Sequence, residues 1–137
     1  MRAFKNILLI ALVILLLTNS VVASGNSTVL PRYTYMNSVS VSLTINESKG
    51  EATCVAAATA WTCPSVKVTC LLQRYQNGGW QTIKTWSDTD SDIVTVDNTW
   101  IIEQGYKYRL RAVGYALDSS NTVLESVTQY SKTYDYS

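Results

Sequence analysis

The 137-residue chain contains no histidine, which is the most frequent general base of enzymes and the commonest metal ligand. Without histidine, a serine or cysteine nucleophile would need lysine as its base, and no Ser-x-x-Lys spacing occurs in the sequence. Carboxylates such as Asp97, Glu103 and Glu125 could still pair as acid–base groups. A small domain offers little room for a substrate cleft, so we expect no enzymatic activity and no cofactor.

Cysteine is scarce as well, and the three that occur are Cys54, Cys63 and Cys70. They form no Cys-x-x-Cys pair, which argues against a zinc site. If a disulfide forms, the odd number of cysteines leaves one free thiol. The sequence is compatible with either a Cys54–Cys70 or a Cys63–Cys70 bond. We favour buried small hydrophobic side chains for Cys54 and Cys70, which fall at inward positions of strand-like segments.

Acidic side chains gather in one short stretch, DTDSD, with Asp88, Asp90 and Asp92 at alternate positions. An EF-hand calcium loop needs Gly at its sixth position and Glu at its twelfth, where this chain has Ile93 and Thr99. The EF-hand interpretation therefore fails. A looser calcium site in a β-loop and a solvated turn whose Asp side chains cap their own backbone are the alternatives, and we predict no metal site.

Neither sign of charge is in excess. The chain has 11 Lys and Arg against 10 Asp and Glu, and removing Arg2 and Lys5 from the count leaves nine cationic residues after Ser24. A protein that binds nucleic acid or an anionic membrane would show a basic stripe. We therefore predict no nucleic-acid partner, and no membrane partner once the N-terminus has been processed.

Long apolar runs are missing except near the start, where ILLIALVILLL follows the basic opening MRAFKN. A basic start, a short apolar run and a small-residue exit are typical of a secretory signal peptide. The run is shorter than the roughly 20 residues that a membrane span needs. We predict a helical signal peptide over residues 1–24, cleaved after Ala23 or Ser24, and a secreted, extracellular protein. An uncleaved anchor is the alternative.

The rest of the chain predicts a short polar linker over residues 25–33 and a β-sandwich domain over residues 34–137. Segments rich in Val, Thr and Tyr alternate apolar with polar residues between turn residues, and no helical periodicity competes with them. They predict an all-β fold, an antiparallel two-sheet sandwich of about seven strands. The predicted strands lie within residues 35–45, 51–61, 66–75, 79–86, 93–96, 106–116 and 121–134.

In the segment QGYKYRLRAV, Gly105 stands three residues before Tyr108, and alternating apolar and charged residues lead to a closing Ala-Val. This segment resembles the sixth strand of a fibronectin type III or related immunoglobulin-like domain. The resemblance implies that Gly105 and Tyr108 are structural residues, with the Tyr108 hydroxyl tying the preceding loop to the strand.

A second pattern runs through nearly the whole chain after the predicted signal peptide. Its motifs are ATC at 52–54, LQ at 72–73, Trp80, Trp86, GYKYR at 105–109, Glu125 and YS at 130–131. Their order resembles that of a family of small, uncharacterised secreted proteins of Gram-positive, clostridia-like bacteria. The resemblance implies a secreted location and a β fold, and it implies no activity.

The segment QNGG predicts a tight hairpin between the third and fourth strands. A two-residue Asn-Gly loop would pair Tyr75 with Trp80 and Leu72 with Ile83, and it would turn Trp80 and Trp86 away from the core. A three-residue loop shifts the parity by one and turns both tryptophans inward. Turn chemistry favours the two-residue loop, and both registers remain open.

In the favoured register, the candidate ligand contacts are Tyr75, Trp80, Trp86, Arg109 and Arg111, on the outer side of one sheet. Exposed aromatic rings stacked with guanidinium groups suit a protein- or sugar-binding platform. A self-contained aromatic ladder that only covers the sheet is the other interpretation.

We predict a secreted, non-catalytic interaction module that binds an unknown protein or glycan at the cell surface. The alternative is a carbohydrate- or cell-wall-binding module, in which polar groups such as Gln73 or Asp88 would bind hydroxyls. A purely structural or toxin-like secreted β protein is the third possibility.

Overall fold

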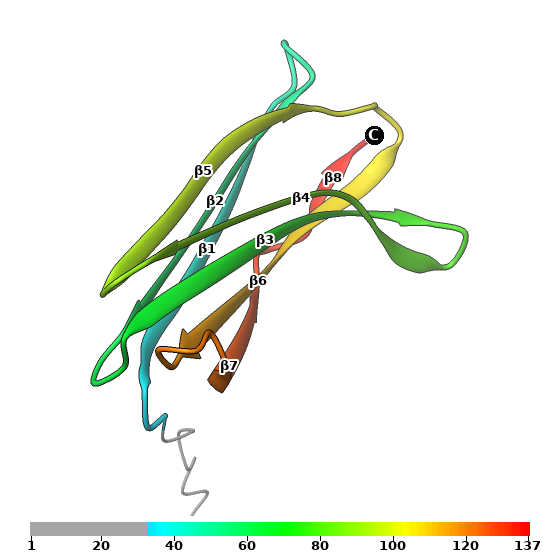
Figure 1. Ribbon diagram of the computed structural model, residues 1–137. Helices are drawn as coiled ribbons and strands as arrows, with labels where there is room; N and C mark the ends of the chain where they lie inside the picture. The colour runs from blue at the N-terminus through cyan, green and yellow to red at the C-terminus, as the bar shows by residue number, and fades with distance from the viewer. Residues whose placement is uncertain (1–32) are drawn as a thin grey trace, which may run out of the picture. The chain divides into compact units, whose positions relative to one another are not determined.

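Eight strands form two antiparallel sheets in the computed structural model, which describes residues 33–137 (Figure 1). The smaller sheet has the order β1-β2-β5, and the larger sheet has the order β4-β3-β6-β7, with β8 also paired to β6. The predicted signal peptide and nearly all of the predicted linker lie outside the described residues. The strands are β1 (Met36–Asn46), β2 (Glu51–Ala60), β3 (Ser65–Gln76), β4 (Gly79–Asp90), β5 (Ile93–Ile101), β6 (Tyr106–Leu117), β7 (Val123–Tyr130) and β8 (Tyr134–Tyr136).

The prediction of an antiparallel two-sheet β-sandwich is confirmed, and a strand lies at each of the seven predicted positions. Two strands are longer than predicted, because β4 continues to Asp90 and β5 continues to Ile101. Most of the DTDSD stretch, expected as a solvated turn or a loose calcium loop, therefore belongs to β4. The last predicted strand corresponds to β7, and a further short strand, β8, begins at the end of the predicted range; both pair with β6.

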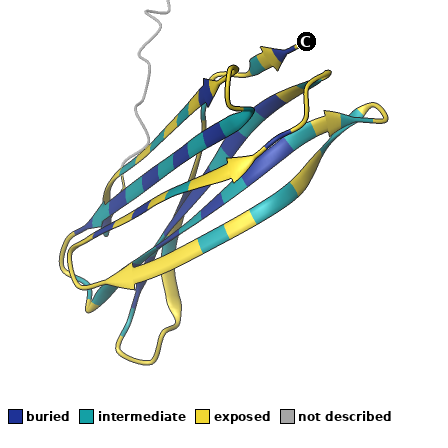
Figure 2. Ribbon diagram, turned by 90° about the horizontal axis from the view of Figure 1, so that it is seen from above, coloured by how far each residue is buried: buried dark blue, intermediate teal, exposed yellow. Residues whose placement is uncertain are grey.

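The core consists of the inward residues of the two sheets, and the sheets contribute side chains of different size. The buried residues of β2 are small, since four alanines and Cys54 occupy every inward position of that strand. The larger sheet supplies bulkier groups, including Leu72, Tyr108 and Leu110, all with no exposed surface. Figure 2 shows the resulting alternation of buried and less buried residues along the central strands. Period-two alternation is what the pleat of a half-buried strand requires.

The β3–β4 hairpin has the two-residue turn that its sequence favours. Asn77 and Gly78 have φ values of 52° and 80°, so both central residues lie in the left-handed region that a type I′ turn needs. The pairing of Tyr75 with Trp80 is confirmed. The pairing of Leu72 with Ile83 was wrong, because Leu72 pairs with Lys84.

The loop between β5 and β6 is fastened to the core by Tyr108. Its hydroxyl donates a hydrogen bond of 2.6 Å to the carbonyl oxygen of Glu103 and accepts one of 3.2 Å from the Glu103 backbone N–H. Burial raises the pKa of Tyr108, whereas the bond to the Glu103 backbone lowers it, and the net shift is upward. Gly105, with a φ of 97°, makes the turn into β6. This is the link that the immunoglobulin-like resemblance implies.

The start of β1 is fastened to β7 by the carboxylate of Glu125. Its two oxygens accept backbone N–H groups from Thr34, Tyr35 and Met36, at 2.9, 2.8 and 2.6 Å. Desolvation raises the pKa of Glu125, but these three hydrogen bonds outweigh it, so the pKa lies below its ordinary value. The two sheets are thus joined at this side of the sandwich by a charge-assisted contact.

Candidate ligand-binding face

The outer side of the larger sheet carries the candidate residues, and we call it the outer face. Because β3 and β6 pair in register, Gln73 lies opposite Arg109 and Leu71 lies opposite Arg111, with all four side chains pointing away from the core. Trp80 reaches the same side from β4 as the direct partner of Tyr75. Four of the five predicted contacts therefore lie together; they are Tyr75, Trp80, Arg109 and Arg111.

Arg109 lies at the centre of an aromatic stack on this face. The carbon of its guanidinium group is 4.3 Å from the ring centroid of Trp80 and 4.4 Å from that of Tyr130. Tyr75 extends the stack, since its ring meets Trp80 edge-on with centroids 5.4 Å apart and an interplanar angle of 67°. Both distances to Arg109 are within the range of cation–π contacts. The two tyrosines at the ends are exposed, by 42% for Tyr75 and 50% for Tyr130.

Gln73 positions the guanidinium group of Arg109 by a hydrogen bond. Its side-chain oxygen accepts a hydrogen bond of 2.8 Å from Nε of Arg109, and its amide donates one of 3.3 Å to the hydroxyl of Thr82. Gln73 is itself buried, with 7% of its surface exposed. A buried amide with both ends bonded orients the cation above it. The remaining N–H donors of Arg109 are on its terminal nitrogens.

Tyr130, the last residue of β7, completes the stack from the outward position opposite Arg111. Ser131, the next residue, forms two hydrogen bonds with the backbone of Leu110. Its backbone N–H donates to the Leu110 carbonyl oxygen at 3.0 Å, and its hydroxyl oxygen accepts a hydrogen bond from the Leu110 N–H at 2.8 Å. The same hydroxyl donates to the carbonyl of Lys132. Ser131 therefore satisfies the backbone of β6 at the break between β7 and β8. Sequence reasoning left open whether Tyr130 extends the site or belongs to a frayed tail, since only the register with β6 brings it beside Arg109.

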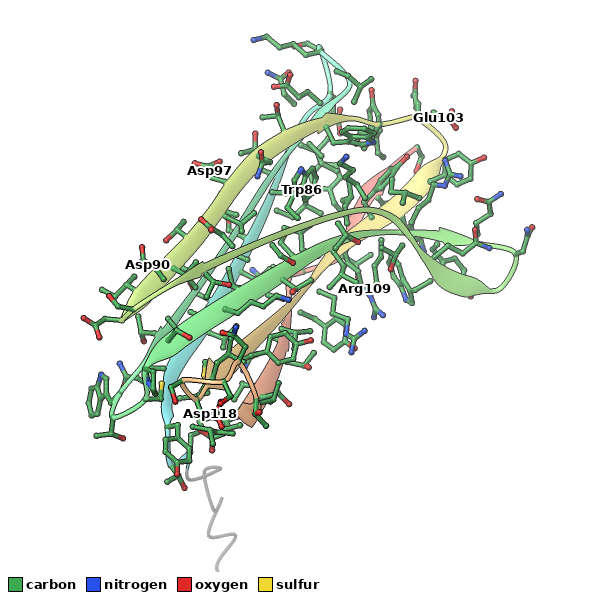
Figure 3. All side chains as sticks on the ribbon, viewed as in Figure 1. Trp86, Asp90, Asp97, Glu103, Arg109 and Asp118 are labelled. Atoms are coloured by element: carbon green, nitrogen blue, oxygen red, sulfur yellow. The ribbon has the colours of Figure 1, made fainter. Side chains whose placement is uncertain are left out.

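Trp86 does not belong to the outer face, which corrects the prediction. A β-bulge in β4 leaves Ile83 without a partner, since Gln73 pairs with Thr82 and Leu72 with Lys84. One extra residue reverses the parity of everything after it, so Lys84 and Trp86 point inward. Figure 3 shows Trp86 between β4 and β5, whereas Arg109 lies on the other side of the larger sheet.

Trp86 instead belongs to a second aromatic cluster, at the side of the sandwich where β4 and β5 meet. Its ring meets that of Trp100 edge-on, with centroids 6.3 Å apart and an interplanar angle of 75°. The ammonium nitrogen of Lys84 lies 4.4 Å from the Trp100 ring centroid and 5.9 Å from that of Trp86. Trp86 also packs against the core. The cluster closes the gap between the edges of the two sheets, and sequence reasoning gave Trp100 no role.

Arg111 occupies the outer face beside the stack. It pairs with Leu71 on β3 and with Tyr130 on β7. Its Nε is buried and has no hydrogen-bond partner in the described part of the chain. An unpaired buried donor carries an energetic cost.

Residues 33–137 contain no group of three His, Cys, Asp or Glu side chains that could hold an ion. The carboxylates of Asp88 and Asp90 accept N–H groups from Thr89 and Ser91, which is the local capping that the sequence suggested. The three cysteines are free thiols, and two of them are buried in the core. The described residues include no helix long and apolar enough to cross a membrane.

Comparison with known proteins gives no match to a protein-family model, to a curated protein or to a solved structure. The resemblance to small secreted proteins of clostridia-like bacteria therefore stays a prediction.

Proposed function

We propose that this chain is a secreted, non-catalytic interaction module that binds a partner at the cell surface through the outer face of its larger sheet. The observation that carries the proposal is the stack of Tyr75, Trp80, Arg109 and Tyr130, which is preorganised by Gln73 and open to solvent at both ends. Rigid aromatic groups provide contact area at a low cost in conformational entropy. Secretion rests on the N-terminal pattern of residues 1–24.

A carbohydrate-binding module is the second candidate, and the arrangement of polar groups on the face favours it. Hydroxyl groups lie beside the rings, including Thr82 and the hydrogen-bonded pair of Thr69 and Ser87, whose oxygens are 2.9 Å apart. Aromatic rings with neighbouring hydrogen-bonding groups suit sugar rings. Asp88 does not contribute, because it pairs with Val68 on the opposite side of the sheet.

The test is co-sedimentation of the purified protein with washed bacterial cell walls, compared for three alanine variants. Trp80→Ala and Tyr130→Ala should each reduce the bound fraction at least fivefold, because they remove the two sides of the stack. Trp86→Ala is the matched control, since it removes a tryptophan of the same strand from the opposite side. We expect it to bind cell walls whenever it is folded.

Two outcomes would overturn the proposal. One is retention of full binding by both face variants, which would mean that another surface makes the contact. The other is the absence of binding by the unmodified protein together with a large loss of stability in Trp80→Ala. That result would leave the stack as a structural ladder, and the purely structural interpretation would hold.

A further inference from the structure

We propose that the outer face binds a linear acidic glycan, whose carboxylates pair with Arg109, Arg111 and Lys67. This inference rests on the proposed function and names the chemical class of its partner.

The first observation is a separation of charge that the near-neutral composition hides. Lys107, Arg109 and Arg111 alternate along β6 on the outer face, and Lys67 joins them from β3. Across the outward positions of the larger sheet in residues 33–137, the one acidic side chain is Asp135, opposite Lys107.

The smaller sheet has the reverse character. Its outward positions hold the acidic residues Glu51 and Asp97 and no lysine or arginine in the described strands. The outward positions of the two sheets thus carry opposite charge, which favours an anionic partner on the larger sheet.

The cations follow a line. Alternate residues of a strand are about 6.6 Å apart, so Lys107, Arg109 and Arg111 form an evenly spaced row. Lys67 lies opposite Tyr115, six residues beyond Arg109, which places it about 20 Å further along the strand direction. A linear polymer with repeated negative charges matches this layout better than a compact small molecule.

The far end of the line has a depression of about 440 Å³. The ammonium nitrogen of Lys67 is 5.9 Å from the ring centroid of Tyr115 there. This volume is in the range of small-ligand sites and would hold a sugar unit with its carboxylate near the lysine. The depression is lined by Lys67, Thr89, Tyr115, Leu117, Asn121 and Val123.

The chemistry between the two ends favours a glycan over an acidic peptide. A sheet face has its backbone N–H and C=O groups already paired, so a peptide cannot add to it as a further strand. What this face offers instead is exposed rings and rows of hydroxyls, among them Thr69, Ser87 and Thr128. Rings that stack on sugar C–H groups, hydroxyls that bond to sugar hydroxyls and guanidinium groups that pair with carboxylates match the three parts of a uronic acid unit.

The experiment is titration of the purified protein with sodium oligogalacturonate, followed by intrinsic tryptophan fluorescence, at 0.05 M and 0.5 M NaCl. Neutral dextran and poly-L-glutamate are titrated in parallel. We expect saturable binding of oligogalacturonate that weakens about tenfold in high salt, because exposed ion pairs are screened. Dextran should not bind, and poly-L-glutamate should bind at least tenfold more weakly.

Substitution of single cationic residues tests whether they contact the oligogalacturonate. Arg111→Gln and Lys67→Gln should each weaken oligogalacturonate binding at least fivefold, with the unfolding midpoint unchanged. Lys49→Gln is the matched control, because Lys49 lies in the turn between β1 and β2, away from the outer face. It should bind as tightly as the unmodified protein.

Three results would overturn the acidic-glycan inference. If dextran bound as tightly as oligogalacturonate, and Lys67→Gln and Arg111→Gln bound as tightly as the unmodified protein, the partner would be a neutral glycan. Tighter binding of poly-L-glutamate would mean an acidic protein partner. No binding of any of the three polymers would remove the inference outright, while the proposed function would still be decided separately by cell-wall sedimentation.

Discussion

Trp80 and Trp86 stand six residues apart on β4 and point to opposite sides of the larger sheet, because the bulge at Ile83 lies between them. An even spacing on a regular strand would have placed both on one side. Trp80 is thereby available to the stack on Arg109, and Trp86 is available to Trp100 at the seam between the sheets. One inserted residue thus divides the tryptophans of this strand between the outer face and the seam between the sheets.

The two tryptophans should accordingly differ in their effect on stability. Trp86→Ala removes a ring that packs against the core, so we expect the free energy of unfolding to fall by about 3 kcal/mol. Trp80→Ala should cost only about 1 kcal/mol, because a surface cation–π contact and an aromatic pair are worth little more. Urea unfolding followed by far-ultraviolet circular dichroism measures both. An equal loss in the two variants would contradict the division of roles.

How far the fold follows from the sequence can be seen along β3 and β6. Their period-two alternation is a local property, and it predicted both strands and the side of β3 that holds Val66, Val68, Cys70 and Leu72 in the core. The turn at Asn77 and Gly78 was predictable for the same reason: two residues with positive φ satisfy a type I′ turn by themselves.

On the β3–β4 hairpin, the sequence predicted the side chains of the site correctly only for the residues between the turn and the bulge. Leu72 pairs with Lys84 because the strands then bring Trp86 against the core, and this gain depends on the smaller sheet, which the hairpin sequence does not contain. Tyr130 was left undecided and Trp100 was missed for the same reason. Each is brought to its cluster by a partner strand distant in sequence.

A close approach of the two sheets should make Gly114 intolerant of a side chain. A Cβ there would lie 2.6 Å from a methyl carbon of Val39, 2.8 Å from the terminal methyl of Met36 and 3.2 Å from Cβ of Ala58. Valine is stiff, so the strands would have to separate, and we expect Gly114→Ala to lower the unfolding free energy by about 1–3 kcal/mol.

Gly79→Ala is the control for this substitution, because a Cβ at Gly79 meets nothing within 4 Å and its φ is not positive. It should leave the unfolding free energy within about 0.5 kcal/mol of the unmodified protein. Thermal and urea unfolding measure the stability of the two variants. If Gly114→Ala were as stable as Gly79→Ala, the two sheets would have to be further apart at β1.

Glu125 should make the sandwich sensitive to acid. Its pKa is lower in the folded state than in the unfolded chain, so its contribution is complete above the unfolded pKa and is lost as the pH falls through the folded value. Glu125→Gln should lower stability at pH 7 by about 1 kcal/mol, since one amide oxygen cannot accept three N–H groups. The variant should also lose less stability than the unmodified protein between pH 5 and pH 3.

Asp97→Asn provides the comparison for Glu125→Gln, because Asp97 is exposed on the outer side of β5. Chemical unfolding at pH 7, 5 and 3 gives the three stability curves. Parallel curves for all three proteins would mean that the start of β1 does not depend on the carboxylate.

The buried cysteines predict a specific pattern of thiol reactivity. Burial, together with a smaller effect of the neighbouring Cys70, raises the pKa of Cys54 to about 12, and burial raises the pKa of Cys70 to about 11. The thiolate is the reactive form, so at pH 8 both should react with Ellman's reagent at least roughly a hundredfold more slowly than the half-buried Cys63, and Cys54 should be the slower of the two. One thiol should titrate quickly in the native protein and three in denaturant. A single thiol in denaturant would instead reveal a disulfide.

The same two thiols should weaken the fold in alkali. Because their pKa values are higher in the folded state, the unfolded chain releases protons first, and stability is lost as the pH rises above about 9 towards 11 and 12. Cys54→Ala should flatten this decline relative to the unmodified protein, even though its absolute stability is lower from the lost side-chain volume. Urea unfolding at pH 7, 9 and 10.5 separates the two effects, because the volume term is independent of pH. An unchanged slope in Cys54→Ala would mean that other groups, such as the buried hydroxyl of Tyr108, govern the alkaline decline.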